Sequence, residues 1–166
     1  MRDPRVSDAE AVLTKNAPDL LRYFQRREPD DAADLLAETL LVAWRRVHDL
    51  PADNTEARMW LFGVARTVVL GHARDTARRS RLADRLRDLP GPIATDTDAA
   101  LDVRAAIADL PEPDAELIRL VHWEGLSVAG AAQVLGINAS TARGRYQRSR
   151  EALAAALGTK VGEDAR

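Results

Sequence analysis

Side chains suited to binding nucleic acid gather near the C-terminal end of the chain. Asn138 is a favourable helix N-cap, and helix-forming sequence follows it to about Leu157. Polar side chains on the first turns of this predicted helix can reach phosphates and base edges, where a bidentate arginine–guanine pair contributes about 1–3 kcal/mol of discrimination. With the cap itself, these candidate DNA contacts are Asn138, Ser140, Thr141, Arg143, Arg145, Gln147 and Arg148.

A second short helix precedes this one and sets its position. Ser127 can cap a helix from Val128 to Leu135, and Gly136 can form the tight turn that follows. A short helix, a glycine turn and a capped second helix have the spacing of a helix-turn-helix. An ordinary helical hairpin with an arginine-rich solvent face is the alternative at this point.

Other chemistry has little support in the sequence. The three histidines, His48, His72 and His122, are scattered without paired ligand spacing, and there is no cysteine. No glycine-rich phosphate loop or nucleophile elbow is present. We therefore expect no enzyme, no metal site, no cofactor and no small-molecule substrate. With no signal peptide and no apolar run of about 20 residues, we expect a cytoplasmic protein without a membrane partner.

The charges are segregated along the chain, although the net charge is only −2. Residues 58–87 hold eight arginines and two acids, whereas residues 28–38 hold five acids and no base. Residues 88–102 hold four aspartates and no base. This pattern indicates at least two partner surfaces of different charge, with solvated helix faces as the alternative.

The periodicity and composition predict an all-α fold of two small helical domains, joined by a flexible acidic linker. We expect a first domain over 8–87, a linker over 88–98 that contains Pro90, Gly91 and Pro92, and a second domain over 99–160. In the second domain, Val103, Ile107 and Leu110 line the first helix, Pro113 begins the next, and Gly125 ends it.

Three helices are predicted in the first domain. The first covers 8–27, with an interruption near Pro18, and the second covers 31–47, with Asp30 or Asp31 as its cap. The third covers about 56–82, capped by Asn54 or Thr55, and becomes basic in its second half. The predicted buried positions are Leu36, Leu40, Ala43, Trp44 and Val47 on the second helix and Trp60, Leu61, Val64 and Val68 on the third.

Both halves resemble the extracytoplasmic-function (ECF) sigma factors of RNA polymerase. The C-terminal half resembles sigma domain 4 through "ALDVRAAIADLP", "GLS", "AQVLGI" and "TARGRYQRSREAL". The N-terminal half resembles sigma domain 2 through "DLLAETLLVAW", "MWLFGVART" and the arginine-rich segment after it. The resemblance covers about 10–158 and implies a protein that binds core RNA polymerase and directs promoter-specific initiation.

The resemblance also implies a partner for each segment. Asp34, Glu38, Leu41 and Arg45 would contact the clamp helices of the polymerase β′ subunit, and the second domain would pack on the β flap. The −35 promoter element would be read by the helix over 139–150, and an anti-sigma factor is a further implied partner. The −10 element would be read and melted by His48, Asp53, Asn54, Arg66, Thr67, Arg74, Arg78 and Arg79.

The chain departs from the family pattern at several positions. Ala37, Thr67 and Gly71 replace the family's glutamine, asparagine and acidic residue in the first domain. Gly130 replaces a glutamate, so the capping box from Ser127 is expected to be lost, and Ala142 replaces a valine. We therefore expect an unusual promoter preference. The rival function is a stand-alone helix-turn-helix regulator, which gives residues 10–87 no role.

Overall fold

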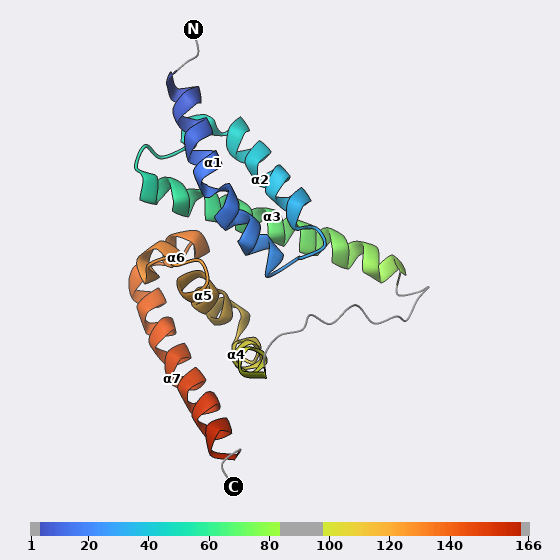
Figure 1. The fold of residues 1–166 in the computed structure, drawn as a ribbon, viewed down its shortest axis with the longest axis vertical. Coiled ribbons are helices and arrows are strands. Elements are labelled where there is room, and N and C mark those ends of the chain that lie inside the picture. The colour runs from blue at the N-terminus through green and yellow to red at the C-terminus, as the bar shows by residue number, and fades with distance from the viewer. Residues whose placement is uncertain (1–3, 84–97, 164–166) are drawn as a thin grey trace. The chain divides into compact units, whose positions relative to one another are not determined.

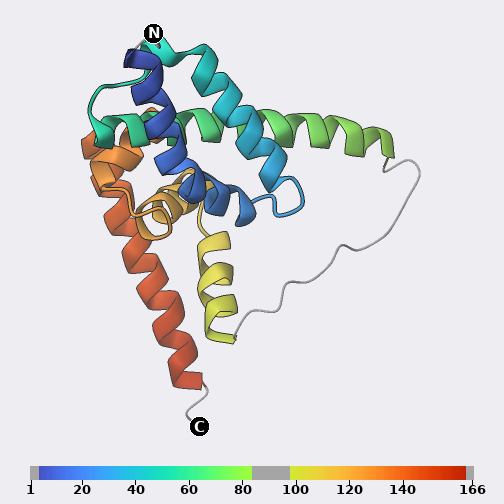
Figure 2. The ribbon, with the colours of Figure 1, turned by 45° about the horizontal axis from the view of Figure 1, so that its top comes forward.

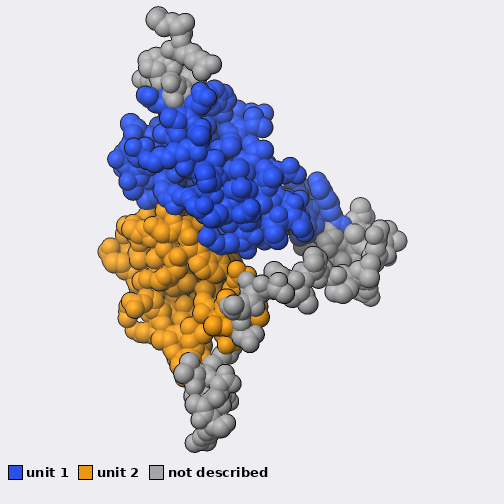
Figure 3. All heavy atoms as spheres, viewed as in Figure 1, with its two compact units in different colours: residues 1–89 blue, residues 90–166 orange. Residues whose placement is uncertain are grey.

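The computed structural model describes residues 4–83 and 98–163, and within them it contains helices and no strand. The chain divides into two compact units, Met1–Leu89 and Pro90–Arg166, which Figure 3 colours separately. The predicted all-α fold of two helical domains is confirmed. The predicted linker over 88–98 lies, apart from Asp98, outside the described residues. None of the described helices is long and apolar enough to span a membrane.

Unit 1 is built from three mutually packed helices and one short turn of 3₁₀ helix. They are α1 (Pro4–Gln25), α2 (Ala32–Arg45), η1 (Val47–Asp49) and α3 (Asn54–Ala83). The helices α1 and α2 contact each other, and α3 crosses both (Figures 1 and 2). In the core, the Tyr23 ring meets the rings of Phe24 and Phe62 edge-on, with centroids 5.3 and 5.5 Å apart. The Tyr23–Phe62 contact joins α1 to α3.

The first helix is continuous, contrary to the predicted interruption near Pro18. Proline removes the hydrogen bond that would reach the carbonyl four residues earlier, which here belongs to Thr14. Both Pro18 and Thr14 are exposed, so water can bind that carbonyl. The buried side of α1 instead depends on Leu20, Tyr23 and Phe24, which anchor the helix beyond the proline.

The buried stripe of α2 differs from the predicted one. Its buried residues are Ala32, Leu35, Thr39 and Ala43, of which only Ala43 was predicted. Thr39 can be fully buried because its hydroxyl donates a hydrogen bond to the Leu35 carbonyl at 2.8 Å. Leu36, Leu40 and Val47 are half-buried instead, whereas the Trp44 side chain is exposed. The core face of α2 is thus rotated about the helix axis relative to the predicted stripe.

The third helix begins earlier than predicted, at Asn54, and its cap is Asp53. The Asp53 carboxylate accepts hydrogen bonds from the backbone N–H groups of Thr55 and Glu56, at 2.9 and 3.0 Å. Leu61, Val64 and Val68 are buried as predicted, whereas Trp60 is half-buried. The Arg46 guanidinium lies over the Trp60 ring, 5.5 Å from its centroid. At the start of α2, Asp31 is the N-cap residue but makes no side-chain capping bond.

Unit 2 consists of α4 (Asp98–Ala108), α5 (Glu112–His122), α6 (Val128–Leu135) and α7 (Ala139–Glu163). Each of α4, α5 and α6 contacts α7 (Figure 2). Ile107, Ala115 and Ile118 form a buried cluster against which Leu110 and Leu153 pack. Val103 is exposed, contrary to expectation, and Pro113 is the second residue of α5 rather than the predicted first.

Candidate nucleic-acid interface

The helices α6 and α7 form the predicted helix-turn-helix, with each end fixed by a local interaction. Ser127 Oγ accepts a hydrogen bond from the Gly130 N–H at 3.0 Å, so the cap survives although only one half of a capping box is present. Gly136 has φ +67°, the left-handed conformation that glycine adopts most readily. Asn138 Oδ1 accepts bonds from the Thr141 N–H and the Ser140 hydroxyl, both at 2.8 Å. The orientation of α7 therefore follows directly from that of α6.

The outer side of α7 presents polar side chains opposite its packed side. Ala142 and Ser149 are buried and face the rest of unit 2. At about 100° per residue, the exposed positions of the first turns point away from them. We call this set the α7 outer face: Ser140, Thr141, Arg143, Gln147 and Arg148. Two guanidinium groups, two hydroxyls and an amide on one solvent-facing arc have the donors and acceptors needed for phosphates and base edges.

Two other residues of α7 are held against α5 instead. Arg145 is half-buried, with its Nε 3.8 Å from the Asp114 carboxylate. The Tyr146 hydroxyl lies 3.0 Å from His122 Nε2, and their rings stack with centroids 5.8 Å apart. These contacts join α7 to α5 through side chains that no sequence pattern pairs. Arg145 therefore lies at the flank of the α7 outer face, and Asn138 at its start, where it acts as a cap.

A line of polar residues runs from the middle of α3 into its basic second half. Arg66, Thr67, Arg74 and Arg78 fall within about a third of the helix circumference, and we call them the α3 basic strip. Arg74 and Arg78 are exposed, Arg66 is half-buried, and Thr67 donates a hydrogen bond to the Gly63 carbonyl at 3.0 Å. Arg79 is also exposed but points to a different side of the helix. This geometry suits contact with a phosphate backbone along the helix.

The other predicted −10 residues lie at the start of α3 and before it. His48 and Asn54 are exposed, whereas one Asp53 oxygen is already used as the helix cap. With a rise of about 1.5 Å per residue, Asn54 lies roughly 18 Å along the helix from Arg66, which lies another ~18 Å from Arg78. The structure therefore does not gather all eight predicted residues into one pocket; they form an extended surface along α3.

The solvent side of α2 combines acidic and apolar groups. Asp34 and Glu38 are exposed, and Leu41 and Trp44 have exposed fractions of 54% and 43%. With Arg45, these residues define the α2 outer face, which lies opposite Leu35, Thr39 and Ala43. Helical periodicity predicts Trp44 in the core, but the structure places it on this exposed face. An exposed tryptophan beside an exposed leucine is typical of a protein-binding surface.

Arg58 is half-buried and pairs within unit 1 rather than belonging to the basic surface. It forms an ion pair with Asp19, and its guanidinium lies 4.9 Å from the centroid of the Phe62 ring. The half-buried position of Arg58 leaves its charge matched inside the unit. The eight arginines counted over 58–87 therefore overstate the charge available to a ligand.

Comparison with protein families divides the chain into two matched regions. Residues 12–79 match Sigma-70 region 2, and residues 100–153 match Sigma-70 region 4. The first match includes α2 and most of α3, and the second includes the helix-turn-helix. The α2 outer face, the α3 basic strip and the α7 outer face all lie inside these matched segments.

Individual proteins extend the similarity over most of the chain. The probable RNA polymerase sigma-C factor of Mycobacterium bovis is 33% identical over 151 residues, which cover 88% of this chain and 81% of the relative. The ECF sigma factor SigL of Mycobacterium tuberculosis is 30% identical, with 86% and 85% covered.

A solved structure shows the same fold. The sigma factor RpoE from Bartonella quintana, in complex with the anti-sigma factor NepR, matches with a TM-score of 0.68 and 24% identity, covering 90% of this chain and 96% of that one. The two similar sequences match both units of this chain, and the match extends over most of the length of each relative. The chain therefore belongs to the ECF family of RNA polymerase sigma factors.

Proposed function

We propose that this chain binds core RNA polymerase through the α2 outer face and reads a promoter at two places. The α3 basic strip, with His48, Asp53, Asn54 and Arg79, contacts the −10 element, and the α7 outer face, flanked by Asn138 and Arg145, contacts the −35 element. The observation that carries this proposal is the match of both regions, in order, to one family of polymerase subunits. A stand-alone regulator would need only the second region.

The composition of each surface supports its assignment. Promoter phosphates attract the guanidinium groups of α3 and α7, and base edges in the major groove suit the mixed donors and acceptors of α7. The α2 outer face has acidic groups around two exposed apolar side chains, which favours a protein partner over DNA. Promoter DNA and core polymerase would therefore each meet a surface of complementary chemistry.

The domain boundaries, the location and the remaining partners are part of the same proposal. We assign domain 2 to 8–87, the linker to 88–98 and domain 4 to 99–160, with domain 4 packing on the β flap. The protein acts by binding rather than by catalysis, in the cytoplasm where polymerase acts. An anti-sigma factor is a further proposed partner, because RpoE was solved in complex with one.

A binding experiment with core polymerase tests the α2 assignment. Leu41→Ala removes an apolar side chain that is more than half exposed, so the free energy of unfolding should change little. Loss of a central interface side chain costs about 1–2 kcal/mol, which is a roughly 5- to 30-fold weaker affinity for core. Glu38→Arg should weaken binding as well, through charge reversal beside the same contact.

The matched control reverses a charge elsewhere on unit 1. Asp8 is exposed on α1, and Asp8→Arg should leave core affinity within twofold, as expected for a charge outside the interface. Affinity can be measured by fluorescence anisotropy of labelled protein titrated with core polymerase. Equal affinities for wild type, Leu41→Ala and Glu38→Arg would contradict the assignment of the α2 outer face.

A further inference from the structure

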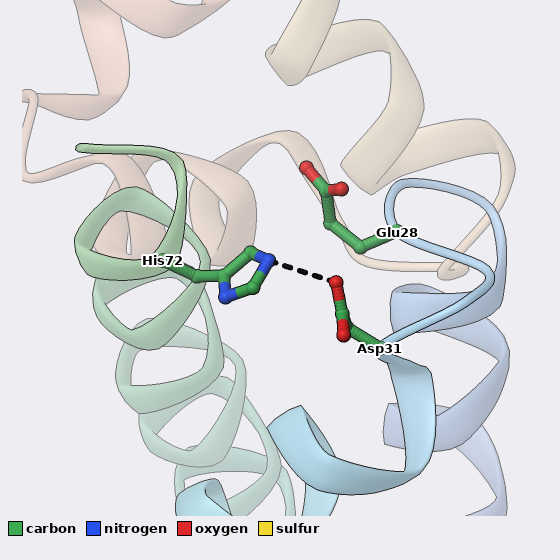
Figure 4. Close-up of side chains that lie close together, drawn as sticks. All are labelled: Glu28, Asp31 and His72. Atoms are coloured by element: carbon green, nitrogen blue, oxygen red, sulfur yellow. Dashed lines mark ion pairs between the residues drawn. The ribbon is translucent and has the colours of Figure 1, made fainter. Parts of the chain in front are cut away.

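Three potential metal ligands from separate segments of the chain converge in unit 1. Glu28 and Asp31 lie in the turn between α1 and α2, and His72 lies in the second half of α3. Their ligand atoms all lie within 4.8 Å of one another (Figure 4). The sequence showed no paired spacing because His72 follows Asp31 only after α2 and half of α3. Packing of α2 on α3 brings the three together.

The geometry of the group is set by the backbone rather than by flexible side chains alone. In the turn, the Glu28 N–H donates to the Phe24 carbonyl at 2.7 Å, and the Asp31 N–H donates to the Glu28 carbonyl at 3.2 Å. All three side chains are half-buried, so they are partly shielded from water. A ligand could therefore bind here without refolding the turn.

The imidazole of His72 presents one nitrogen to a group of oxygens. Its Nε2 lies 3.1 Å from Asp31 Oδ2 and 3.4 Å from the Thr76 hydroxyl (Figure 4 shows the first of these contacts). The contact between His72 and Asp31 involves two of the three ligands. It leaves the Glu28 carboxylate as a second negative charge beside a single imidazole. A divalent cation would balance both carboxylates.

We propose that Glu28, Asp31 and His72 bind a divalent transition-metal ion of the Zn²⁺ class. Zinc binds imidazole nitrogen and carboxylate oxygen at about 2.0–2.2 Å, which places neighbouring ligand atoms roughly 3 Å apart, as the Asp31–His72 contact already does. Mg²⁺ and Ca²⁺ prefer oxygen ligands throughout, so the imidazole selects against them. Water completes the coordination of the ion.

The bound ion would join the start of α2 to α3. These helices carry the α2 outer face and the α3 basic strip, so occupancy of the site would stabilise unit 1 in the arrangement that both surfaces need. An ion that binds the folded chain and not the unfolded one raises the midpoint of thermal unfolding as its concentration increases. This predicts metal-dependent stability for a chain without cysteine.

The test titrates the full-length protein with Zn²⁺ alone, and with Mg²⁺ as the comparison, by calorimetry and thermal unfolding. We expect one Zn²⁺ per chain and a higher unfolding midpoint for the wild type, with no such shift for Mg²⁺. His72→Ala and Glu28→Gln should each weaken Zn²⁺ binding roughly tenfold or more and abolish the shift, measured from each variant's own metal-free midpoint. Glu28→Gln keeps the size of the side chain, so it tests the site even where His72→Ala does not fold.

His48→Asn is the matched control, because it removes an exposed histidine from the same unit. Zn²⁺ affinity should stay within twofold of the wild type in this variant. Backbone NMR signals broadened by Mn²⁺ should centre on residues 28–31 and 72. The proposal is overturned by a wild type that does not bind Zn²⁺ at micromolar concentrations, by unchanged binding in Glu28→Gln, or by an equal loss of binding in His48→Asn.

Discussion

Replacing Asn138 separates a capping role from a DNA-reading role on the recognition helix. Its side-chain oxygen accepts the Thr141 N–H and the Ser140 hydroxyl, both at 2.8 Å, and the residue is exposed. Asn138→Ala removes the acceptor without leaving a buried cavity, so the expected cost is that of a lost cap, about 1 kcal/mol. Asn138→Ser keeps an oxygen at the same position and should cost only a few tenths of a kcal/mol.

The expected readout is local as well as global. A loss of about 1 kcal/mol opens the first turns of α7 about five times more often, which hydrogen exchange of residues 139–150 measures directly. In a domain of 60–100 residues the same loss lowers the unfolding midpoint by about 4–8 °C. Asn138→Ser should match the wild type in both measurements.

Binding to duplex promoter DNA in the polymerase complex completes the comparison. If Asn138 acts as a cap, Asn138→Ser retains wild-type affinity while Asn138→Ala loses affinity in step with helix opening. Weak DNA binding by a fully stable Asn138→Ser would show that the amide contacts DNA in addition to capping the helix. Unchanged hydrogen exchange in Asn138→Ala would refute the calculated stability effect.

Three further results are expected from the same structure. Gly136→Ala should destabilise unit 2 by about 1–2 kcal/mol in urea unfolding, because φ is +67° although the space beside the residue is open. Gly71→Ala, also in open space but inside α3, should instead stabilise unit 1 by about 0.5–1 kcal/mol, and a loss of stability there would contradict the helical geometry. Arg143→Ala should reduce the slope of log affinity against log salt by about 1 if this guanidinium contacts a phosphate, whereas an unchanged slope would exclude that contact.

The helix-turn-helix could be predicted from sequence because its signals are local. Ser127, Gly136 and Asn138 each act on residues within one turn, and each has the predicted role in the structure. The capping box expected to be lost at Gly130 is lost only in part, because the Gly130 backbone N–H still donates a hydrogen bond to Ser127. Features that depend on short-range hydrogen bonds and local backbone conformation can thus be predicted from the sequence.

The core face of α2 could not be predicted from the same kind of reading. Two apolar stripes run along this helix, and periodicity predicts burial of the wider one, with Leu36, Leu40 and Trp44. The true core face includes Thr39, whose hydroxyl is satisfied within the helix and therefore tolerates burial. Apolar periodicity does not distinguish a core from an interface, because both bury the same kinds of side chain once the partner is bound.

Contacts between distant segments also could not be predicted from the sequence. The Tyr146–His122 and Arg145–Asp114 contacts depend on how α7 crosses α5, and the His72–Asp31 contact depends on how α3 crosses α2. Residue spacing gives no register across such crossings. Predictions that rested on side-chain type alone, such as a DNA contact for Arg145, are therefore among those that the structure changed most.

Transcription from a library of randomised promoters, with core polymerase and this chain, tests the central claim most directly. Transcripts should appear only when the chain is added, and the selected promoters should share two sequence blocks at a fixed separation, one for each unit. Arg143→Ala together with Arg148→Ala should erase selection in the upstream block and leave the downstream block in place. Selection of a single block, or transcription that does not depend on the added chain, would contradict the account.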